Sequence, residues 1–273
     1  MTITRRDLLA GAGLMSAGMV AAPPAISALP GALPLAVPFP PSNPLPPRAD
    51  PASSAEGPAR KLKVIVAGGH PGDPEYGCGG TISRLAGLGH QVALLYLNDG
   101  AWPPTPASTR LAEAAKACAI LKGRPLYANQ ENGHAIIDND HYEAFAKILD
   151  AEKPDLVLTQ WPIDNHRDHR AITALVFDAW NRAKRSFSLY YYEVSDGEDT
   201  LQFSPTHYID ISESEPAKRA ACYAHFSQTP DRYYKLQDDV AAFRGVECGS
   251  RRAEAFVLQS RSPGDPLRLL LAS

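Results

Sequence analysis

The stretch KLKVIVAGGHPGDPEYGCGGTI, residues 61–82, carries the strongest indication of the fold. Its first residues are apolar and β-branched and predict a buried strand that ends in a glycine pair. The turn that follows holds His70, Asp73 and Glu75, with Gly72 among them. Groups able to bind a metal or transfer a proton therefore stand at the end of a strand, where α/β proteins place their ligand sites.

Along the rest of the chain, apolar strand-like runs alternate with segments of helical periodicity. Strands are predicted at 61–67, 91–97, 125–128, 155–161, 188–194, 206–212 and 254–259. Helices are predicted at 79–88, 108–123, 139–152, 169–184, 214–225 and 231–244. This alternation indicates an α/β fold with βαβ units and a Rossmann-like, mostly parallel sheet that carries helices on both faces. The expected order of the first five strands is 3-2-1-4-5.

The first 60 residues differ in composition from the rest. Arg5 and Arg6 precede an apolar run rich in Ala and Gly, which is typical of a twin-arginine export signal and which we assign to 1–28. Residues 29–60 are rich in Pro and Ala and predict an extended linker without a core. We expect the catalytic domain at 61–273, and a periplasmic or extracellular location.

The apolar run of this leader is too short and too weakly hydrophobic for a transmembrane span, so we expect no stable membrane insertion after the signal is cleaved. Cleavage is compatible with Ala22 or Ala28, and the sequence does not choose between them. The chain has 27 Lys and Arg against 30 Asp and Glu, a net charge of −3, without a block of like charge. We therefore expect no nucleic acid partner.

The cysteines are spread along the chain without a C-x-x-C pair, so a zinc site built from thiolates is not expected. They are Cys78, Cys118, Cys222 and Cys248, and each is expected to be a small buried apolar residue. If the protein is exported, a disulfide between Cys222 and Cys248 stays open.

A second polar motif follows the strand predicted at 155–161. The sequence WPIDNHRDHRAIT places His166, Asp168 and His169 there. In the expected strand order the first and fourth strands are neighbours, so the loops at their carboxyl ends meet where the order reverses. Two histidines and one aspartate from these loops would leave a position open for water, which is the layout of a catalytic zinc site. The same ligand types describe the Fe(II) facial triad, so a non-haem iron enzyme stays open.

The motifs HPGDPEYGCGGTI and NHRDHRA together resemble those of the LmbE-like (PIG-L) family of zinc-dependent N-deacetylases. Its first motif usually reads H-P-D-D-x-x-x-G-C-G-G-T and its second H-x-D-H. The resemblance covers most of the predicted domain and implies Zn²⁺, or another divalent metal such as Fe²⁺, held by His70, Asp73 and His169. It further implies that His166 is the electrophilic or acid group and that Asp168 orients a histidine.

Gly72 departs from the family pattern, because the family has at this position the aspartate that acts as the general base. Glycine cannot accept a proton, and general-base catalysis contributes about 10²–10⁴-fold. Glu75 is the predicted substitute, since its side chain is longer and lies in the same loop; Asp164 and His166 are alternatives. Glu75 is equally compatible with a surface or capping role.

Other residues receive secondary interpretations. The glycines of GCGGT, 77–81, are expected to let the turn and helix pack closely against the metal loop rather than to bind an anion. Metal binding is not expected of His134, His141, His207 and His225. Trp102 and Tyr190–Tyr192 are compatible with a sugar site, with sheet packing favoured for the tyrosines.

The expected function is that of an exported, zinc-dependent hydrolase, weakened by Gly72, that removes an N-acetyl group from an amino-sugar or glycoconjugate. Its expected partner is that small substrate. The alternative is a catalytically impaired metal- or carbohydrate-binding protein of the same fold. The identity of the substrate, the native metal and the oligomeric state stay open.

Overall fold

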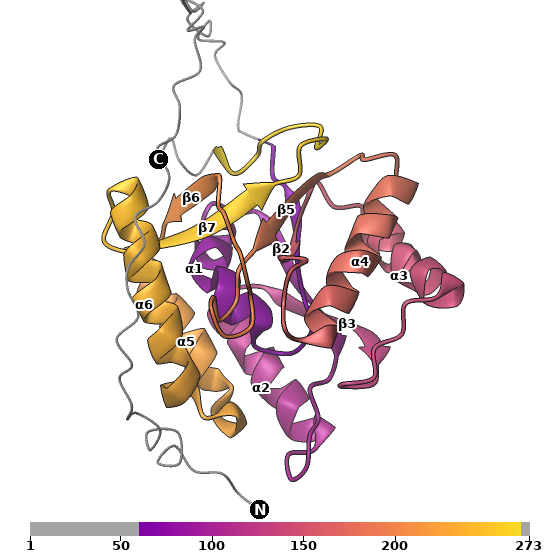
Figure 1. Ribbon diagram of the computed structural model, residues 1–273, viewed down its shortest axis with the longest axis horizontal. Coiled ribbons are helices and arrows are strands. Elements are labelled where there is room, and N and C mark those ends of the chain that lie inside the picture. The colour runs from indigo at the N-terminus through magenta and orange to yellow at the C-terminus, as the bar shows by residue number, and fades with distance from the viewer. Residues whose placement is uncertain (1–59, 269–273) are drawn as a thin grey trace, which may run out of the picture. The chain divides into compact units, whose positions relative to one another are not determined.

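A single sheet runs through the computed structural model, which describes residues 60–268 (Figure 1). The strands are β1 (Lys63–Gly68), β2 (Gln91–Asn98), β3 (Arg124–Gln130), β4 (Leu156–Gln160), β5 (Ser188–Tyr192), β6 (His207–Asp210) and β7 (Ala253–Leu258). Their order is β3-β2-β1-β4-β5-β7-β6. The first five are parallel, whereas β7 runs antiparallel to β5 and β6. The predicted 3-2-1-4-5 order and the mostly parallel sheet are confirmed.

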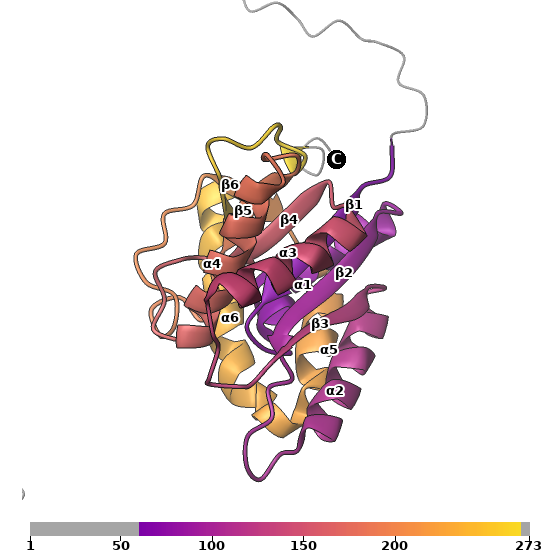
Figure 2. The ribbon, with the colours of Figure 1, turned by 90° about the vertical axis from the view of Figure 1, so that its right-hand side faces the viewer.

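Helices cover both faces of this sheet (Figures 1 and 2). They are α1 (Asp73–Gly87), α2 (Ala107–Ile120), α3 (Asn139–Glu152), α4 (Arg167–Arg182), α5 (Glu215–Ala224) and α6 (Pro230–Cys248). Alternate residues of β1 face opposite sides. Val64 belongs to the core cluster that also contains Ile82 of α1, and Ile65 to the cluster that contains Ile172 of α4. Each face of the central strand is therefore sealed by its own hydrophobic layer.

Helix α1 begins six residues earlier than the sequence predicts, at Asp73 rather than at 79. Glycine is penalised inside helices, which is why the run 77–81 suggested a turn. Here the glycines are used for close contact. A Cβ on Gly77 would lie 2.4 Å from the Tyr192 ring of β5, and one on Gly80 would lie 2.6 Å from Ile211. The prediction that these glycines allow close packing is confirmed, but they pack against β5 and Ile211 and not against the predicted metal loop.

A buried ion pair fastens α5 to this arrangement. Lys218 Nζ donates to Glu254 Oε1 at 2.7 Å, and both side chains are buried. The Glu254 carboxylate also accepts the backbone N–H groups of Gly80 and Thr81. Three elements, α1, α5 and β7, are thus joined by one carboxylate.

The predicted signal and linker, 1–28 and 29–60, lie outside the described residues except for Arg60, so both stay predictions. In the described part of the chain, every helix is too short or too polar to cross a membrane. The cysteines are free thiols; Cys248 is exposed, against the prediction that each would be buried. It lies at the end of α6, where the chain turns outward at Gly249.

Candidate metal centre and active site

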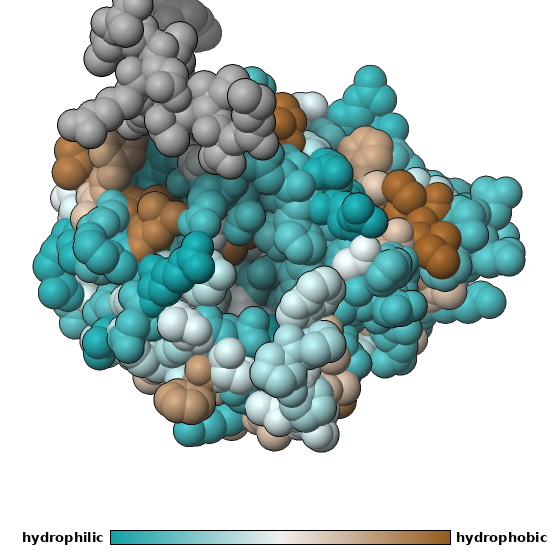
Figure 3. Space-filling view, turned by 60° about the horizontal axis from the view of Figure 1, so that its bottom comes forward, coloured by the Kyte–Doolittle hydropathy of each residue, from teal (hydrophilic) through white to brown (hydrophobic). Residues whose placement is uncertain are grey.

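The carboxyl ends of β1 and β4 border a cavity of about 660 Å³. Figure 3 looks onto this hollowed and largely hydrophilic face of the molecule. The cavity is lined by His70, Gly72, Asp73, Tyr76, Trp102, Arg110, His166, His169 and His225, among others. The loops after β1 and β4 are held together by a bond from Gly69 N to Gln160 Oε1, 2.9 Å long. The two motifs therefore meet where the strand order reverses.

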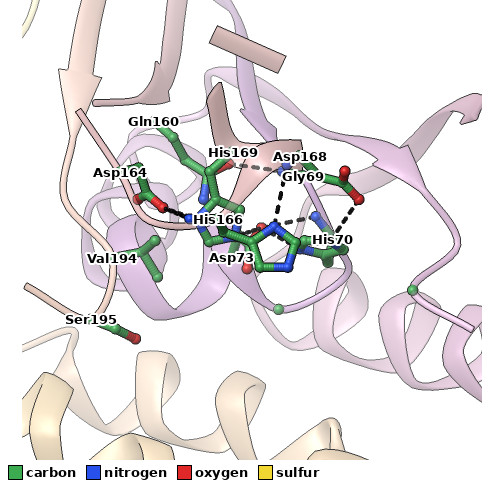
Figure 4. Close-up of polar contacts among 12 residues, drawn as sticks. Gly69, His70, Asp73, Gln160, Asp164, His166, Asp168, His169, Val194 and Ser195 are labelled. Atoms are coloured by element: carbon green, nitrogen blue, oxygen red, sulfur yellow. Dashed lines mark hydrogen bonds and ion pairs between the residues drawn. The ribbon is translucent and has the colours of Figure 1, made fainter. Parts of the chain in front are cut away.

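Three potential ligand atoms converge on one point of the cavity wall (Figure 4). His70 Nδ1 and His169 Nε2 each lie 3.2 Å from Asp73 Oδ2. Ligands about 2.0–2.1 Å from a tetrahedral zinc ion lie about 3.3 Å from one another, so each of these two distances matches the spacing of ligands on one small cation. Two imidazoles and one carboxylate suit Zn²⁺ or Fe²⁺. The residues present therefore fit a divalent metal.

A third imidazole stands beside them. Ring nitrogens of His70, His166 and His169 lie within 4.8 Å of one another. His166 is the N-cap of α4, and its Nδ1 accepts the N–H of Asp168 at 3.2 Å. Its ring stacks on that of His169 at 4.6 Å between centroids. Because Nδ1 is used by the helix cap, Nε2 is the nitrogen of His166 that remains for a ligand.

Each predicted histidine ligand has a carboxylate on its other nitrogen (Figure 4). Asp168 Oδ2 lies 3.2 Å from His70 Nε2, and Asp164 Oδ1 lies 3.1 Å from His169 Nδ1. Such a carboxylate fixes the proton on the nitrogen that faces it and leaves the opposite lone pair for a metal. This is the contact that an orienting role for Asp168 requires; the role itself stays a prediction.

The buried Asp168 carboxylate is held by groups far apart in the sequence. Oδ2 accepts Asn98 Nδ2 at 3.0 Å and the backbone N–H of Gly133 at 2.8 Å. Burial raises the pKa of Asp168, but the hydrogen bonds from His70 and from Gly133 lower it to about 2. Asp168 is therefore a carboxylate throughout the physiological range.

The role of Asp164 in the site was not predicted from the sequence, because Asp164 was considered only as an alternative base. Besides facing His169, it accepts the N–H of His166 at 2.7 Å and the hydroxyl of Thr200 at 3.1 Å. Both of its oxygens are occupied, so it is placed to hold the histidines. Its position two residues before a histidine, in a loop that forms a helix cap, was the available signal.

The carboxylates of the site raise the pKa values of two of its histidines. Burial lowers the pKa of His169, but Asp73 and Asp164 raise it to about 10. The pKa of His70 is also raised, against burial, by Asp73 and Asp168. The protons on the His70 and His169 rings offset the negative charge of the surrounding carboxylates. A divalent cation bound at the same place would offset that charge instead. The pKa of His166 is instead lowered by burial and by repulsion from its neighbouring histidines, which favours the neutral ring.

Glu75 lies beneath the cavity wall rather than on it. Oε1 accepts Tyr96 Oη at 2.7 Å and lies 3.0 Å from His225 Nε2, while Oε2 accepts the N–H of Gly72 at 3.1 Å. The side chain is fully buried and caps α1. These contacts bear out the capping alternative and not the surface one. A base role for Glu75 stays a prediction, and both of its oxygens are engaged.

Gly72 has a backbone conformation that glycine favours, with φ 118° and ψ −41°. A Cβ built there would lie 3.6 Å from the Tyr76 ring and 3.9 Å from His225 Cδ2. A side chain at this position is thus disfavoured by the backbone torsion and not by lack of space. The wall of the cavity has a gap where the family's base is expected.

Known proteins resemble this chain in sequence and fold. Residues 65–180 match the PIG-L family, described as GlcNAc-PI de-N-acetylase. Diacetylchitobiose deacetylase from Thermococcus kodakarensis is 26% identical over 218 residues, covering 71% of this chain and 82% of that protein. The conserved protein TT1542 from Thermus thermophilus, 25% identical, has a TM-score of 0.65 over 75% of this chain and 96% of its own.

A third similarity is one of fold alone. GalB, the 4-carboxy-2-hydroxymuconate hydratase from Pseudomonas putida, is 20% identical and has a TM-score of 0.64, covering 75% of this chain and 98% of that protein. A deacetylase and a hydratase are therefore both similar to this chain, and the fold does not decide the reaction.

Proposed function

We propose that this chain, which matches the PIG-L family over residues 65–180, is a metal-dependent hydrolase that removes an N-acetyl group from a small amino-sugar or glycoconjugate. The observation that carries the proposal is the pair of carboxylate-oriented histidines that meet Asp73 at the cavity wall. Zinc is the proposed metal, with Fe²⁺ as the alternative. When bound, the cation would polarise the amide carbonyl and lower the pKa of water to about 7.

The protein's own groups then have separate tasks. Asp168 and Asp164 hold the imidazoles of His70 and His169 in one tautomer and orientation. His166, neutral and with Nδ1 engaged by the helix cap, offers its Nε2–H to the carbonyl oxygen as negative charge develops there. We therefore propose that His166 acts as a neutral imidazole, and not as the protonated ring that a general acid would need.

The cavity suits a small polar ligand. A volume of about 660 Å³ falls within the usual range for small-molecule sites, roughly 300–1,000 Å³. Trp102 lines it and is 67% exposed, so its ring face is available to stack on a sugar. Tyr190–Tyr192 are buried in β5, in agreement with sheet packing.

Gly72 favours a second candidate function, a metal- and carbohydrate-binding protein without turnover. The family's base position carries no side chain, and the described contacts engage both oxygens of Glu75. Such a protein would keep the metal centre and the cavity but would not cleave an amide bond.

One set of measurements separates the two candidates. The zinc-loaded protein is incubated with N,N'-diacetylchitobiose and with N-acetylmuramic acid, and released acetate is quantified. Turnover that is lost in His169→Ala supports the hydrolase. Binding of either sugar without turnover, together with activity created by Gly72→Asp, supports the binding protein. If Glu75→Gln abolishes turnover of N,N'-diacetylchitobiose, which carries no carboxylate, while zinc content and fold are kept, Glu75 is the base.

A further inference from the structure

We propose that the gap beside Gly72 is a subsite for a carboxylate carried by the substrate, and that this carboxylate accepts the proton of the attacking water in place of a side chain at position 72. The inference rests on the proposed hydrolase function. It names the substrate class: N-acetylated compounds, amino-sugars among them, that bear a carboxylate close to the acetamido group.

The first support is the shape of the wall. Gly72 lines the cavity, and the space in front of its Cα is bordered by the Tyr76 ring at 3.6 Å and by His225 at 3.9 Å. At φ 118° an L-residue is strained, so the chain itself is poorly able to fill this space. A ligand group can enter it without that strain.

The second support is a set of buried polar atoms without partners. Tyr76 Oη, Arg110 Nε and His225 Nδ1 each lack a hydrogen-bond partner among residues 60–268. Their residues are only 8%, 2% and 0% exposed, and all three line the same cavity. Buried polar groups in native proteins are normally paired. Three such residues in the wall of one cavity therefore indicate a polar ligand there.

The chemistry of these atoms indicates an anion. Arg110 is a cation, and its Nε–H can only donate. Its Nη2 donates to Pro71 O at 2.5 Å and its Nη1 pairs with Glu113 Oε2 at 3.3 Å, so Nε is the nitrogen that remains for a ligand. The Tyr76 hydroxyl can donate as well. A guanidinium together with a hydroxyl donor suits a carboxylate.

His225 adds an acceptor. Its Nε2 faces the Glu75 carboxylate at 3.0 Å and so carries the ring proton, which leaves Nδ1 as an acceptor. After the substrate carboxylate has taken up a proton, its new O–H group can donate to this acceptor. Glu75 thus acts through His225 as a positioning residue, and donors and acceptor together suit both protonation states of the ligand group.

The step balances without a further reagent. The substrate carboxylate takes a proton from water, so one O–H bond breaks and a carboxylic acid forms. The oxygen of the resulting hydroxide bonds to the acetamido carbon, and the C–N bond then breaks. The leaving nitrogen takes the proton from the carboxylic acid, which restores the carboxylate and yields acetic acid and an amine; the acetic acid then ionises in water.

A matched pair of substrates tests the base role. N-acetylmuramic acid differs from N-acetylglucosamine by a lactyl group that carries a carboxylate. We expect kcat/KM of the zinc-loaded protein to be about 10²-fold higher for the acid. Sodium formate should raise turnover of N-acetylglucosamine but not of N-acetylmuramic acid, with sodium chloride as the control. Equal kcat/KM for the two sugars and no effect of formate would overturn the base role while leaving the hydrolase intact.

Binding of formate tests the subsite without turnover. Calorimetric titration of the zinc-loaded protein should show saturable binding that Tyr76→Phe weakens about 10-fold and Arg110→Gln abolishes. Because the Tyr76 hydroxyl has no partner in the described structure, Tyr76→Phe should keep the wild-type Tm. Tyr233→Phe, another tyrosine of the cavity wall, is the matched control and should bind formate as wild type does.

Formate binding that Tyr76→Phe leaves unchanged would overturn the subsite. If neither sugar is cleaved, with or without formate, the hydrolase fails and the base role with it. The calorimetry then still decides whether the carboxylate subsite exists.

Discussion

Asp164→Asn is the most informative single change, because it alters the orientation of one histidine and leaves the predicted ligands in place. Asparagine has nearly the same shape and can still accept the N–H of His166 through its amide oxygen. The Thr200 hydroxyl can turn to accept from the new amide nitrogen. The fold should therefore persist, and the loss is confined to the negative charge that faces His169 Nδ1 at 3.1 Å.

The size of the effect follows from that contact. Loss of a carboxylate that orients a metal-bound histidine typically weakens metal binding 10–100-fold. This factor corresponds to about 1.4–2.8 kcal/mol of binding free energy. The amide oxygen at the Oδ1 position still accepts from His169 Nδ1, so the tautomer is kept. A neutral acceptor holds the ring less firmly than a carboxylate and makes it less basic, so His169 becomes a weaker ligand.

The assay is a competition titration of the metal-free protein with zinc and a chromophoric chelator, accompanied by thermal unfolding of the same samples. Asp199→Asn is the matched control, since Asp199 lines the same cavity and makes no hydrogen bond to His169 in the described structure. A zinc affinity for Asp164→Asn within about 3-fold of wild type, or an equal loss in both variants, would refute the orienting role.

Three further predictions follow from the packing and charges described above. Gly77→Ala should lower the free energy of unfolding by about 1–3 kcal/mol, because the new methyl group would meet the Tyr192 ring on β5. Gly87→Ala, in the same helix but with open space around it, should raise the free energy of unfolding by about 0.5–1 kcal/mol. Urea unfolding that shows equal effects for the two variants would contradict this prediction. Lys218→Met should lower the free energy of unfolding by about 3–5 kcal/mol in the same assay, because it leaves the Glu254 carboxylate buried without its cation. A loss under about 1 kcal/mol would contradict this prediction. Asp73 and Asp164 hold the pKa of His169 at about 10 against burial, so the ring is protonated below that pH. Zinc affinity should therefore rise with pH, and each bound zinc should displace at least one proton at about pH 8. Calorimetric heats that do not depend on the ionisation enthalpy of the buffer would contradict this prediction.

The proximity of His70, Asp73 and His169 could be predicted from sequence because it depends on periodic signals. Strand β1 and strand β4 are marked by apolar runs, and the topology of α/β sheets brings their carboxyl ends together. His70 and Asp73 closely follow the first run, and His169 lies in the first turn of the helix after the second, so their meeting required no knowledge of side-chain detail. The family resemblance and the strand order supported the same site independently.

The surroundings of the triad could not be predicted in this way, because they depend on contacts between distant segments. The N–H of Gly133 on Asp168 is a backbone group that carries no sequence signal. The burial of Glu75 follows from helix α1 starting at Asp73, which the glycine content of that stretch concealed. Tertiary contact with β5 outweighs helix propensity there.

The position of a bound metal tests the central claim most directly. Crystals of the full chain grown with zinc and measured at the zinc absorption edge would show the ion as an anomalous difference peak. The account predicts one peak bonded to His70 Nδ1, Asp73 and His169 Nε2, with Asp168 and Asp164 behind the two imidazoles. A peak elsewhere, or one bonded to His166 in place of Asp73, would contradict it.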